Sequence, residues 1–181
     1  MDKSKKMQHI FVPIITIMAA VFFDQWTKFL AVMHLKDSPA YVIIKNVFEL
    51  HYLENQGAAF GILQNQQWFF LIGGIAVLIG AAFIYIRMPH TRRFTLLRIC
   101  LILIVSGAIG NMIDRVRLQD VVDFFYFKLI DFPIFNVADI YVTVAAISLI
   151  ILILFYYKEE EIDELFARIL KHKGSENDER I

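Results

Sequence analysis

The stretch Gly107–Asp139, GAIGNMIDRVRLQDVVDFFYFKLIDFPIFNVAD, determines how this chain is organised. It lies between two long apolar segments, yet it is rich in acidic, amide and basic side chains: Asn111, Asp114, Arg115, Asp120, Asp123, Asn136 and Asp139. Polar groups at the edge or in the interior of a bilayer cost free energy, so they are usually paired or functional. The function of the chain therefore depends on where these groups lie relative to a membrane.

The composition points to a membrane protein. Of the 181 residues, 58% are hydrophobic and only 20% are charged, against roughly 25% in soluble domains. The mean hydropathy is +0.57, and the apolar residues lie in long blocks. Basic and acidic residues number 18 each, so the net charge gives no indication of a nucleic-acid partner and we expect none. The single cysteine, Cys100, excludes an intrachain disulfide and a cysteine-based metal site, and we expect neither a metal nor a cofactor.

Four segments are predicted to cross the bilayer as helices, at about residues 10–32, 68–86, 94–113 and 137–157. In the first of them, the apolar run Ile10–Phe23 covers only about 21 Å at 1.5 Å per residue, short of a hydrocarbon core of roughly 30 Å. The first span must therefore continue through Asp24 and Lys28, which are one helical turn apart. We expect these two to form an ion pair, with Lys28 also able to reach a lipid phosphate or a peptide carbonyl.

Two longer polar segments, 33–67 and 114–136, connect the spans. The first contains short β-branched and aromatic runs broken by Asn-Gln-Gly, which predicts a small hairpin or sheet, and Asn55 and Gly57 fit a turn with positive φ. The predicted fold class is an all-α polytopic membrane protein: four transmembrane helices with a small β-sheet and a loop outside the membrane. Residues 1–157 form the membrane domain, and 158–181 form a charged amphipathic tail with no catalytic part.

The distribution of basic residues predicts the orientation of the chain. The two termini and the Arg87–Arg98 region hold twelve Lys and Arg residues, whereas the segments 33–67 and 114–136 hold five. By the positive-inside rule the termini are cytoplasmic and these two segments are extracytoplasmic. The polar side chains then converge on the outer leaflet.

Two interpretations of these polar side chains remain open on the residues alone. Asn136 is a good helix N-cap, and Asp139 completes a capping box. Asp114 and Arg115 can cap the end of the third span, but Asp123, between Val122 and Phe124, is harder to assign to folding. The alternative is a pair of carboxyl groups that share one proton in a setting of low dielectric constant. Such a pair can activate water and polarise a carbonyl, as aspartic peptidases do, without a metal or a Ser or Cys nucleophile.

Five ordered motifs, which cover nearly the whole chain, resemble those of the bacterial lipoprotein signal peptidases, also called signal peptidase II. The motifs are Asp24-Gln25-Trp26-Thr27-Lys28, similar to D-x-x-[ST]-K; Asn55-Gln56-Gly57-Ala58-Ala59-Phe60, similar to N-x-G-[AI]-[AS]-F; Gly110-Asn111-Met112-Ile113-Asp114-Arg115, similar to G-N-x-x-D-R; Val121–Phe124; and Phe135–Asp139. No motif position departs from the family pattern.

The resemblance implies a function and a role for each candidate residue. Asp123 and Asp139 would be the catalytic pair of an aspartic endopeptidase. Asn55, Gly57, Asn111, Arg115 and Asn136 would position the substrate or the pair, with Asp114, Asp24 and Lys28 in support. The implied substrate is a prolipoprotein whose Cys carries a diacylglyceryl group, cleaved just before that Cys at the outer face of the cytoplasmic membrane. A sheet at about Tyr41–Leu63 would cradle it, and the enzyme would be a monomer in contact with membrane lipids.

Two rival classes remain. Intramembrane Asp and Lys residues also occur along ion paths, so a small transporter or proton-coupled channel is one alternative. Against it, the carboxylates cluster at one interface and no half of the chain is repeated. The other alternative is a non-enzymatic membrane scaffold whose carboxylates are helix caps.

Overall fold

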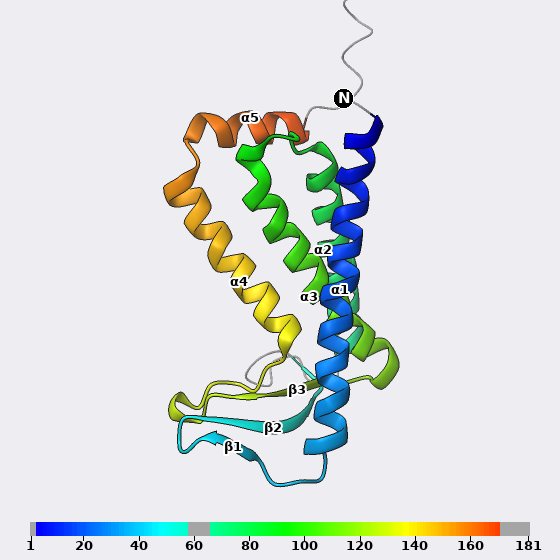
Figure 1. Ribbon diagram of the computed structural model, residues 1–181, viewed down its shortest axis with the longest axis vertical. Helices are drawn as coiled ribbons and strands as arrows, with labels where there is room; N and C mark the ends of the chain where they lie inside the picture. Colours follow the sequence, from blue (N-terminus) through cyan, green and yellow to red (C-terminus); the bar gives the residue numbers. More distant parts are fainter. Residues whose placement is uncertain (1–2, 58–65, 171–181) are drawn as a thin grey trace, which may run out of the picture.

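The computed structural model describes residues 3–57 and 66–170, and within them four long helices form the body of the molecule (Figure 1). These are α1 (Lys3–Leu35), α2 (Gln67–Arg87), α3 (Thr95–Leu118) and α4 (Val137–Ile151), the last extended by a π-helical turn, η4 (Leu152–Tyr156). Four helical segments of the described chain are long and apolar enough to span a membrane: His9–Leu35, Gln67–Arg87, Arg92–Leu118 and Val137–Tyr156. The predicted fold class is therefore confirmed.

Helix α3 is the centre of the bundle, because α1, α2 and α4 all pack against it. Small residues let α4 approach closely: a Cβ on Gly107 would lie 2.5 Å from the carbonyl oxygen of Ala138. The helix also continues to Leu118, beyond the span expected to end near residue 113. Its last turn is held by buried polar contacts of Asp114, and it ends where Gln119 adopts a left-handed conformation with φ 65°.

A three-stranded antiparallel sheet closes one end of the bundle (Figure 1). Its order is β1 (Tyr41–Ile44), β2 (Phe48–Asn55) and β3 (Val121–Tyr126), with a tight turn through Asn46 between the first two. The hairpin was expected, but β3 was not, because VVDFFY lacks the alternation of apolar and polar residues that marks a half-buried strand. Pairing of β2 with β3 places Leu53 opposite Asp123.

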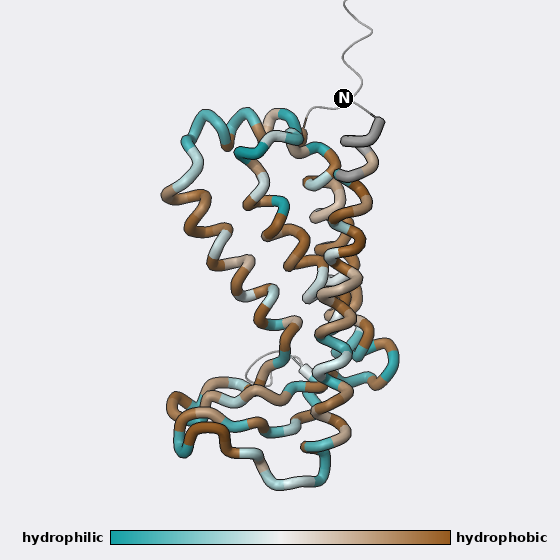
Figure 2. Tube along the Cα trace, in the orientation of Figure 1, coloured by the Kyte–Doolittle hydropathy of each residue, from teal (hydrophilic) through white to brown (hydrophobic). Residues whose placement is uncertain are grey.

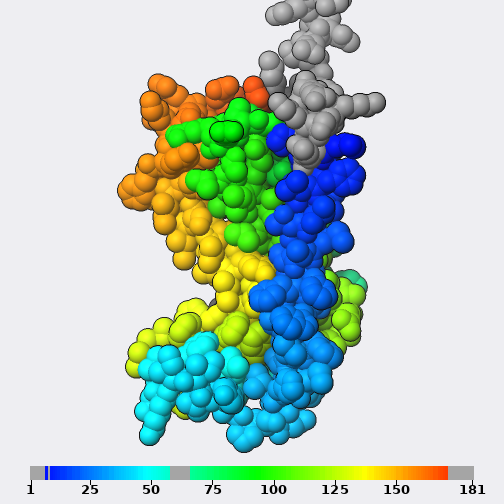
Figure 3. Space-filling view, viewed as in Figure 1, coloured from blue at the N-terminus to red at the C-terminus, as the bar shows by residue number. Residues whose placement is uncertain are grey.

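The opposite end of the bundle carries the amphipathic helix α5 (Glu159–Leu170), which lies across the ends of the spans (Figures 1 and 2). Ile169 is buried there, and Arg93 forms an ion pair of 2.8 Å with Glu161. The space-filling view shows α1 running along one edge of the molecule from this end to the sheet (Figure 3). The remainder of the predicted tail, 171–181, lies outside the described residues, as do Ala58, Ala59 and Phe60 of the second motif.

Candidate active site

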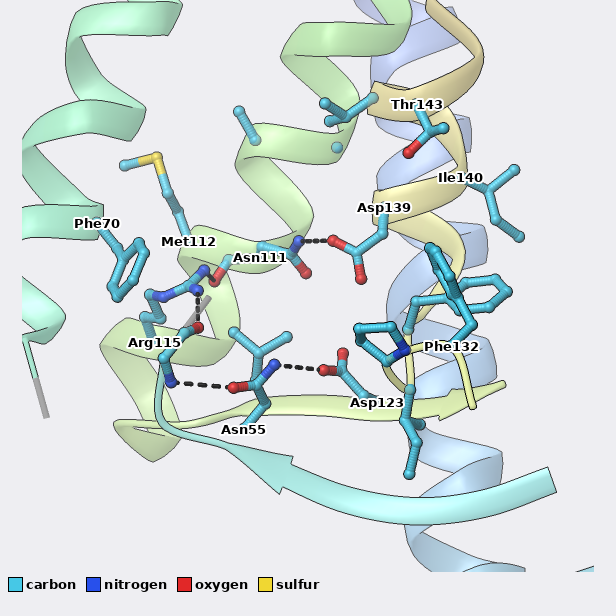
Figure 4. A pocket seen from close by; sticks show the side chains of 18 of the residues that line it. Asn55, Phe70, Asn111, Met112, Arg115, Asp123, Phe132, Asp139, Ile140 and Thr143 are labelled. Carbon is cyan, nitrogen blue, oxygen red and sulfur yellow. Dashed lines mark hydrogen bonds between the residues drawn. The ribbon is translucent and has the colours of Figure 1, made fainter. Parts of the chain in front are cut away.

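A cavity of about 720 Å³ lies between the sheet and helices α2, α3 and α4 (Figure 4). Most of its wall is apolar, with side chains such as Phe70, Met112, Ile130, Phe132 and Ile140. Its polar lining includes Asn55, Asn111, Arg115, Asp123 and Asp139, all of which the sequence singled out, together with Thr143, which it did not. The cavity therefore joins a large apolar volume to a small set of polar groups, as ligand sites commonly do.

Asp123 is carried by β3 and is almost completely buried, with 1% of its surface exposed. Its two carboxyl oxygens accept hydrogen bonds from Asn136 Nδ2 at 2.7 Å and from Asn55 Nδ2 at 2.8 Å. Burial raises the pKa of this carboxyl from its ordinary 3.8 to about 7, and the negative charge of Asp139 adds to the rise. The amide donors act in the opposite direction but do not cancel the cost of burying the charge. Asp123 thus titrates near neutral pH.

Asp139 enters the same cavity from the first turn of α4. Its Oδ2 accepts the backbone N–H of Asn136 at 3.0 Å, while the side chain of Asn136 accepts the N–H of Asp139 at 3.0 Å. The capping box expected from the sequence is therefore confirmed. The other carboxyl oxygen of Asp139, Oδ1, accepts a hydrogen bond from Asn111 Nδ2 at 2.8 Å. This oxygen lies on the cavity side, as Figure 4 shows. The capping and the paired-carboxylate interpretations are consequently compatible, because Asp139 caps α4 with one oxygen and still lines the cavity.

Two asparagines connect the carboxyl groups across the gap between β3 and α4. Asn136 Nδ2 donates both to Asp123 and to Asn111 Oδ1, the latter at 3.0 Å. Asn111 in turn donates to Asp139. Because each amide has its oxygen and its nitrogen engaged, the orientation of both side chains is fixed, and so is the position of each carboxyl group relative to the other.

A buried ionic cluster contacts this network on the side away from the cavity. Lys28 Nζ lies 3.0 Å from Asp24 Oδ2, 2.9 Å from Asp114 Oδ2 and 2.9 Å from Asn111 Oδ1. The predicted pair of Asp24 and Lys28 is therefore confirmed. The expected reach of Lys28 to a lipid phosphate or a peptide carbonyl is wrong, because the side chain is 3% exposed and its described contacts are to the side chains of Asp24, Asp114 and Asn111.

The carboxylates of this cluster also bind the backbones that carry the catalytic candidates. Asp24 Oδ1 accepts the N–H of Ala138 at 2.9 Å, which attaches the start of α4 to α1. Asp114 Oδ2 accepts the N–H of Val122, next to Asp123, at 3.3 Å. Gln25, which the sequence gave no role, donates to Asp114 Oδ1 at 2.9 Å and to Asp24 Oδ2 at 3.2 Å. The sequence signal that could have identified Gln25 was its position inside the first motif, between Asp24 and Lys28.

Arg115 and Gly57 form the opposite wall of the site. The Arg115 guanidinium lies 4.5 Å from the ring centre of Phe70 and donates to the carbonyl of Gly57 at 3.2 Å. The N–H of Gly57 donates to Asn55 Oδ1 at 3.0 Å, which leaves the Asn55 amide nitrogen directed at Asp123. The positive φ expected at Asn55 is wrong: Asn55 is the last residue of β2, and in the described chain the non-glycine residues with positive φ are Asp37, Asn46, Gln119 and Asp131.

Comparison with known proteins first places the chain among bacterial membrane enzymes. Two solved structures, each described as a bacterial membrane enzyme, match with TM-scores of 0.73 and 0.71 at 34% and 33% identity. The first match covers 83% of this chain and 93% of that structure, and the second covers 82% and 96%. At this level of identity and coverage the likeness extends beyond the arrangement of helices.

The sequence comparisons define the family. A family model described as Signal peptidase (SPase) II matches residues 16–155. A lipoprotein signal peptidase of Streptococcus thermophilus is 46% identical over 154 residues, which are 85% of this chain and 97% of that protein. One from Clostridioides difficile is 44% identical over 144 residues, covering 79% and 95%. The chain belongs to the signal peptidase II family, and the family resemblance seen in its motifs is confirmed.

Proposed function

We propose that this chain is an aspartic endopeptidase that removes the signal peptide from diacylglyceryl-modified prolipoproteins by cleaving just before the lipidated Cys. Its family supports a signal peptidase acting on prolipoproteins. The aspartic mechanism rests on one observation above all: Asp123 and Asp139 line one cavity and are joined through Asn136 and Asn111. The other polar lining residues are two amides, an arginine and the hydroxyl of Thr143, none of which acts as a general base at neutral pH.

The two carboxyl groups divide the proton transfers between them. Asp123 holds the proton in the resting enzyme, since burial and its neighbour raise its pKa to about 7. Asp139 takes a proton from a water molecule as the water oxygen attacks the scissile carbonyl carbon, and Asp123 donates its proton to the carbonyl oxygen. Collapse of the tetrahedral intermediate returns that proton to Asp123 and breaks the C–N bond. Asp139 gives its proton to the leaving amine, so that one water is consumed.

The apolar wall of the cavity supports the proposal that the substrate is lipidated. Ile130, Phe132 and Phe127 project from the segment between β3 and α4, and Phe132 lies beside Asp123 in Figure 4. Met112 and Phe70 line the wall on α3 and α2. Acyl chains buried against these side chains would contribute about 0.8 kcal/mol per methylene group. The diacylglyceryl group thereby places the adjacent peptide bond at the carboxyl pair.

The chain is proposed to lie with both termini in the cytoplasm and the carboxyl pair at the extracytoplasmic interface. The twelve basic residues of the termini and the Arg87–Arg98 region, against five in the other two loops, support this orientation. The sheet end of the bundle carries Asp123 and therefore faces outwards. The protein is proposed to act as a monomer, with prolipoproteins and membrane lipids as its partners.

The test is cleavage of a synthetic prolipoprotein peptide by the purified protein in lipid. A peptide with a diacylglyceryl Cys is expected to release its signal segment at the bond before that Cys, whereas the matched peptide with a free Cys thiol is not. The Asp123→Asn variant is the enzyme control. A transporter or a scaffold would cleave neither peptide, and wild-type cleavage at another bond would contradict the proposed specificity.

A further inference from the structure

A second cavity of about 720 Å³ lies at the end of the bundle away from the carboxyl pair. Its floor is α3 and its two sides are α1 and α2, with lining residues such as Ile10, Ile14, Ile17, Leu78, Ala82 and Val105. Every lining side chain is apolar except His9, Tyr85 and His90. We call this space the α1–α2 groove. None of the residues assigned to the proposed peptidase reaction lines it.

The three polar residues gather at the end of the groove nearest the α2–α3 loop. Pro13 has no N–H, so the carbonyl of His9 four residues earlier lacks its helical donor. The Tyr85 hydroxyl donates to that carbonyl at 3.2 Å and so connects α2 to α1. Above this contact the rings of His9 and His90 stack, with centroids 4.4 Å apart. The groove is therefore an apolar channel with imidazole groups at one end.

The length of the groove matches one leaflet of a bilayer. Its lining runs from His9 to Ile17 on α1, and from Leu101 to Ile109 on α3. At 1.5 Å per residue each of these segments rises about 12 Å, close to half of a hydrocarbon core of roughly 30 Å. A transmembrane helix of another protein needs the full thickness, so it does not fit a groove of this length. A single lipid chain from the nearer leaflet does.

We propose that the α1–α2 groove binds an acyl chain of a phospholipid in the leaflet opposite the carboxyl pair, with the lipid phosphate at His9 and His90. Water in an apolar groove finds no hydrogen-bond partners, so hydrating the groove is unfavourable. An acyl chain in the same groove makes favourable dispersion contacts with the lining side chains. The imidazole N–H groups are donors for phosphate oxygens. Arg87 follows the lining residue Ile86. Its guanidinium lies 3.9 Å from the ring centre of Phe83 and makes no ion pair within the described chain, so its N–H groups can still donate to the same head group.

Native mass spectrometry of the purified protein tests this proposal through a matched pair of variants. Ala82 is exposed and lines the groove, and Ala76 is exposed on the same helix but lines neither cavity. The probe is dioleoyl phosphatidylglycerol added to delipidated protein in detergent. Ala82→Phe is expected to weaken binding of one lipid molecule at least tenfold, whereas Ala76→Phe leaves it unchanged. Both variants are expected to cleave the lipidated peptide, which shows that they are folded.

The head group is tested with dioleoylglycerol, which has the same chains without the phosphate. It is expected to bind at least tenfold more weakly than the phospholipid, and inorganic phosphate alone is expected not to bind. Equal lipid binding by wild type, Ala82→Phe and Ala76→Phe would overturn the site. Equal binding of the two lipids would overturn the role of the imidazoles. The proposal is also overturned if the wild-type protein binds no phospholipid, which is the result expected if a peptide segment fills the groove. This outcome holds whatever the peptidase activity of the protein.

Discussion

Lys28 Nζ lies 2.9 Å from the amide oxygen of Asn111, although the two residues are 83 positions apart in the chain. Because this oxygen accepts from a lysine, the Asn111 nitrogen must face the other way, towards Asp139. An ionic cluster inside the membrane domain thereby sets the orientation of an amide in the candidate active site. The cluster and the carboxyl pair form one connected polar network.

Removing Lys28 is expected to damage folding more than chemistry. Lys28→Ala leaves Asp24 and Asp114 buried without their cation, a loss of about 3–5 kcal/mol for a broken buried pair. We expect a lower yield of folded protein and reduced but detectable cleavage per folded molecule. Lys36→Ala, which breaks the exposed pair of Lys36 and Glu54, is the control and should have little effect on stability, because solvent screens that pair. A stable, well-folded Lys28→Ala protein without any turnover would place Lys28 in the catalytic step instead.

Close packing of α3 on α4 is expected to control the position of Asp139. A Cβ on Gly107 would meet the carbonyl of Ala138, whereas one on Gly73 would have no atom within 4 Å. Gly107→Ala should therefore displace α4, cost about 1–3 kcal/mol and lower cleavage. Gly73→Ala should leave cleavage unchanged and raise stability by up to about 1 kcal/mol. Thermal unfolding and cleavage are measured together, and equal effects of the two substitutions would contradict the packing argument.

The raised pKa of Asp123 predicts a pH dependence of cleavage. If its protonated form donates to the scissile carbonyl, kcat/KM should fall about tenfold per pH unit above about pH 7. Substrate capture by the same protein should change little over that range, since the lipid contacts carry no charge. A kcat/KM that stays constant from pH 6 to pH 9 would contradict the assignment of the proton to Asp123.

The same pKa predicts how stability changes with pH. The folded protein holds the Asp123 proton up to about pH 7, whereas the unfolded chain releases it near the ordinary pKa of 3.8. The folded state therefore binds more protons between these values, and the contribution of Asp123 to stability is lost as the pH rises through that window. Unfolding temperatures measured from pH 4 to pH 8 should fall less in Asp123→Asn than in the wild type. Parallel curves for the two proteins would contradict the raised pKa.

The proposed orientation is tested by thiol labelling in intact cells. Cysteines introduced at Arg92 and Gln119 lie at opposite ends of α3. The native Cys100 is buried, so it should contribute little background. An impermeant thiol reagent is expected to label the Gln119→Cys protein and not the Arg92→Cys protein. Labelling of Arg92→Cys alone would reverse the orientation.

The sequence predicted those features that depend on neighbours along the chain. Span lengths follow from apolar runs, the ion pair of Asp24 and Lys28 follows from their spacing, and the capping box follows from Asn136 and Asp139. What it missed depends on distant contacts. Asp114 and Asn111 join Lys28 only when α3 packs on α1, so the full cluster has no local signal. Likewise β3 is buried on both faces, with Val122 and Phe124 on one and Val121 and Asp123 on the other, so it lacks the alternation of a half-buried strand.

The central claim is that Asp123 and Asp139 act as one catalytic unit. The claim depends on the tertiary structure, because the two residues belong to different elements. The two lie on β3 and at the start of α4, so only the fold brings them together. Asn preserves the shape of each side chain but can neither take nor give the proton. The losses in the two single variants and in the double variant should therefore be similar instead of additive.

The most direct test measures cleavage and capture of the diacylglyceryl peptide by Asp123→Asn, Asp139→Asn and the double variant in lipid. All three are expected to insert in the membrane and to capture the peptide, and all three are expected to lack measurable cleavage. Substantial cleavage by either single variant would contradict the aspartic mechanism, whatever family the chain belongs to.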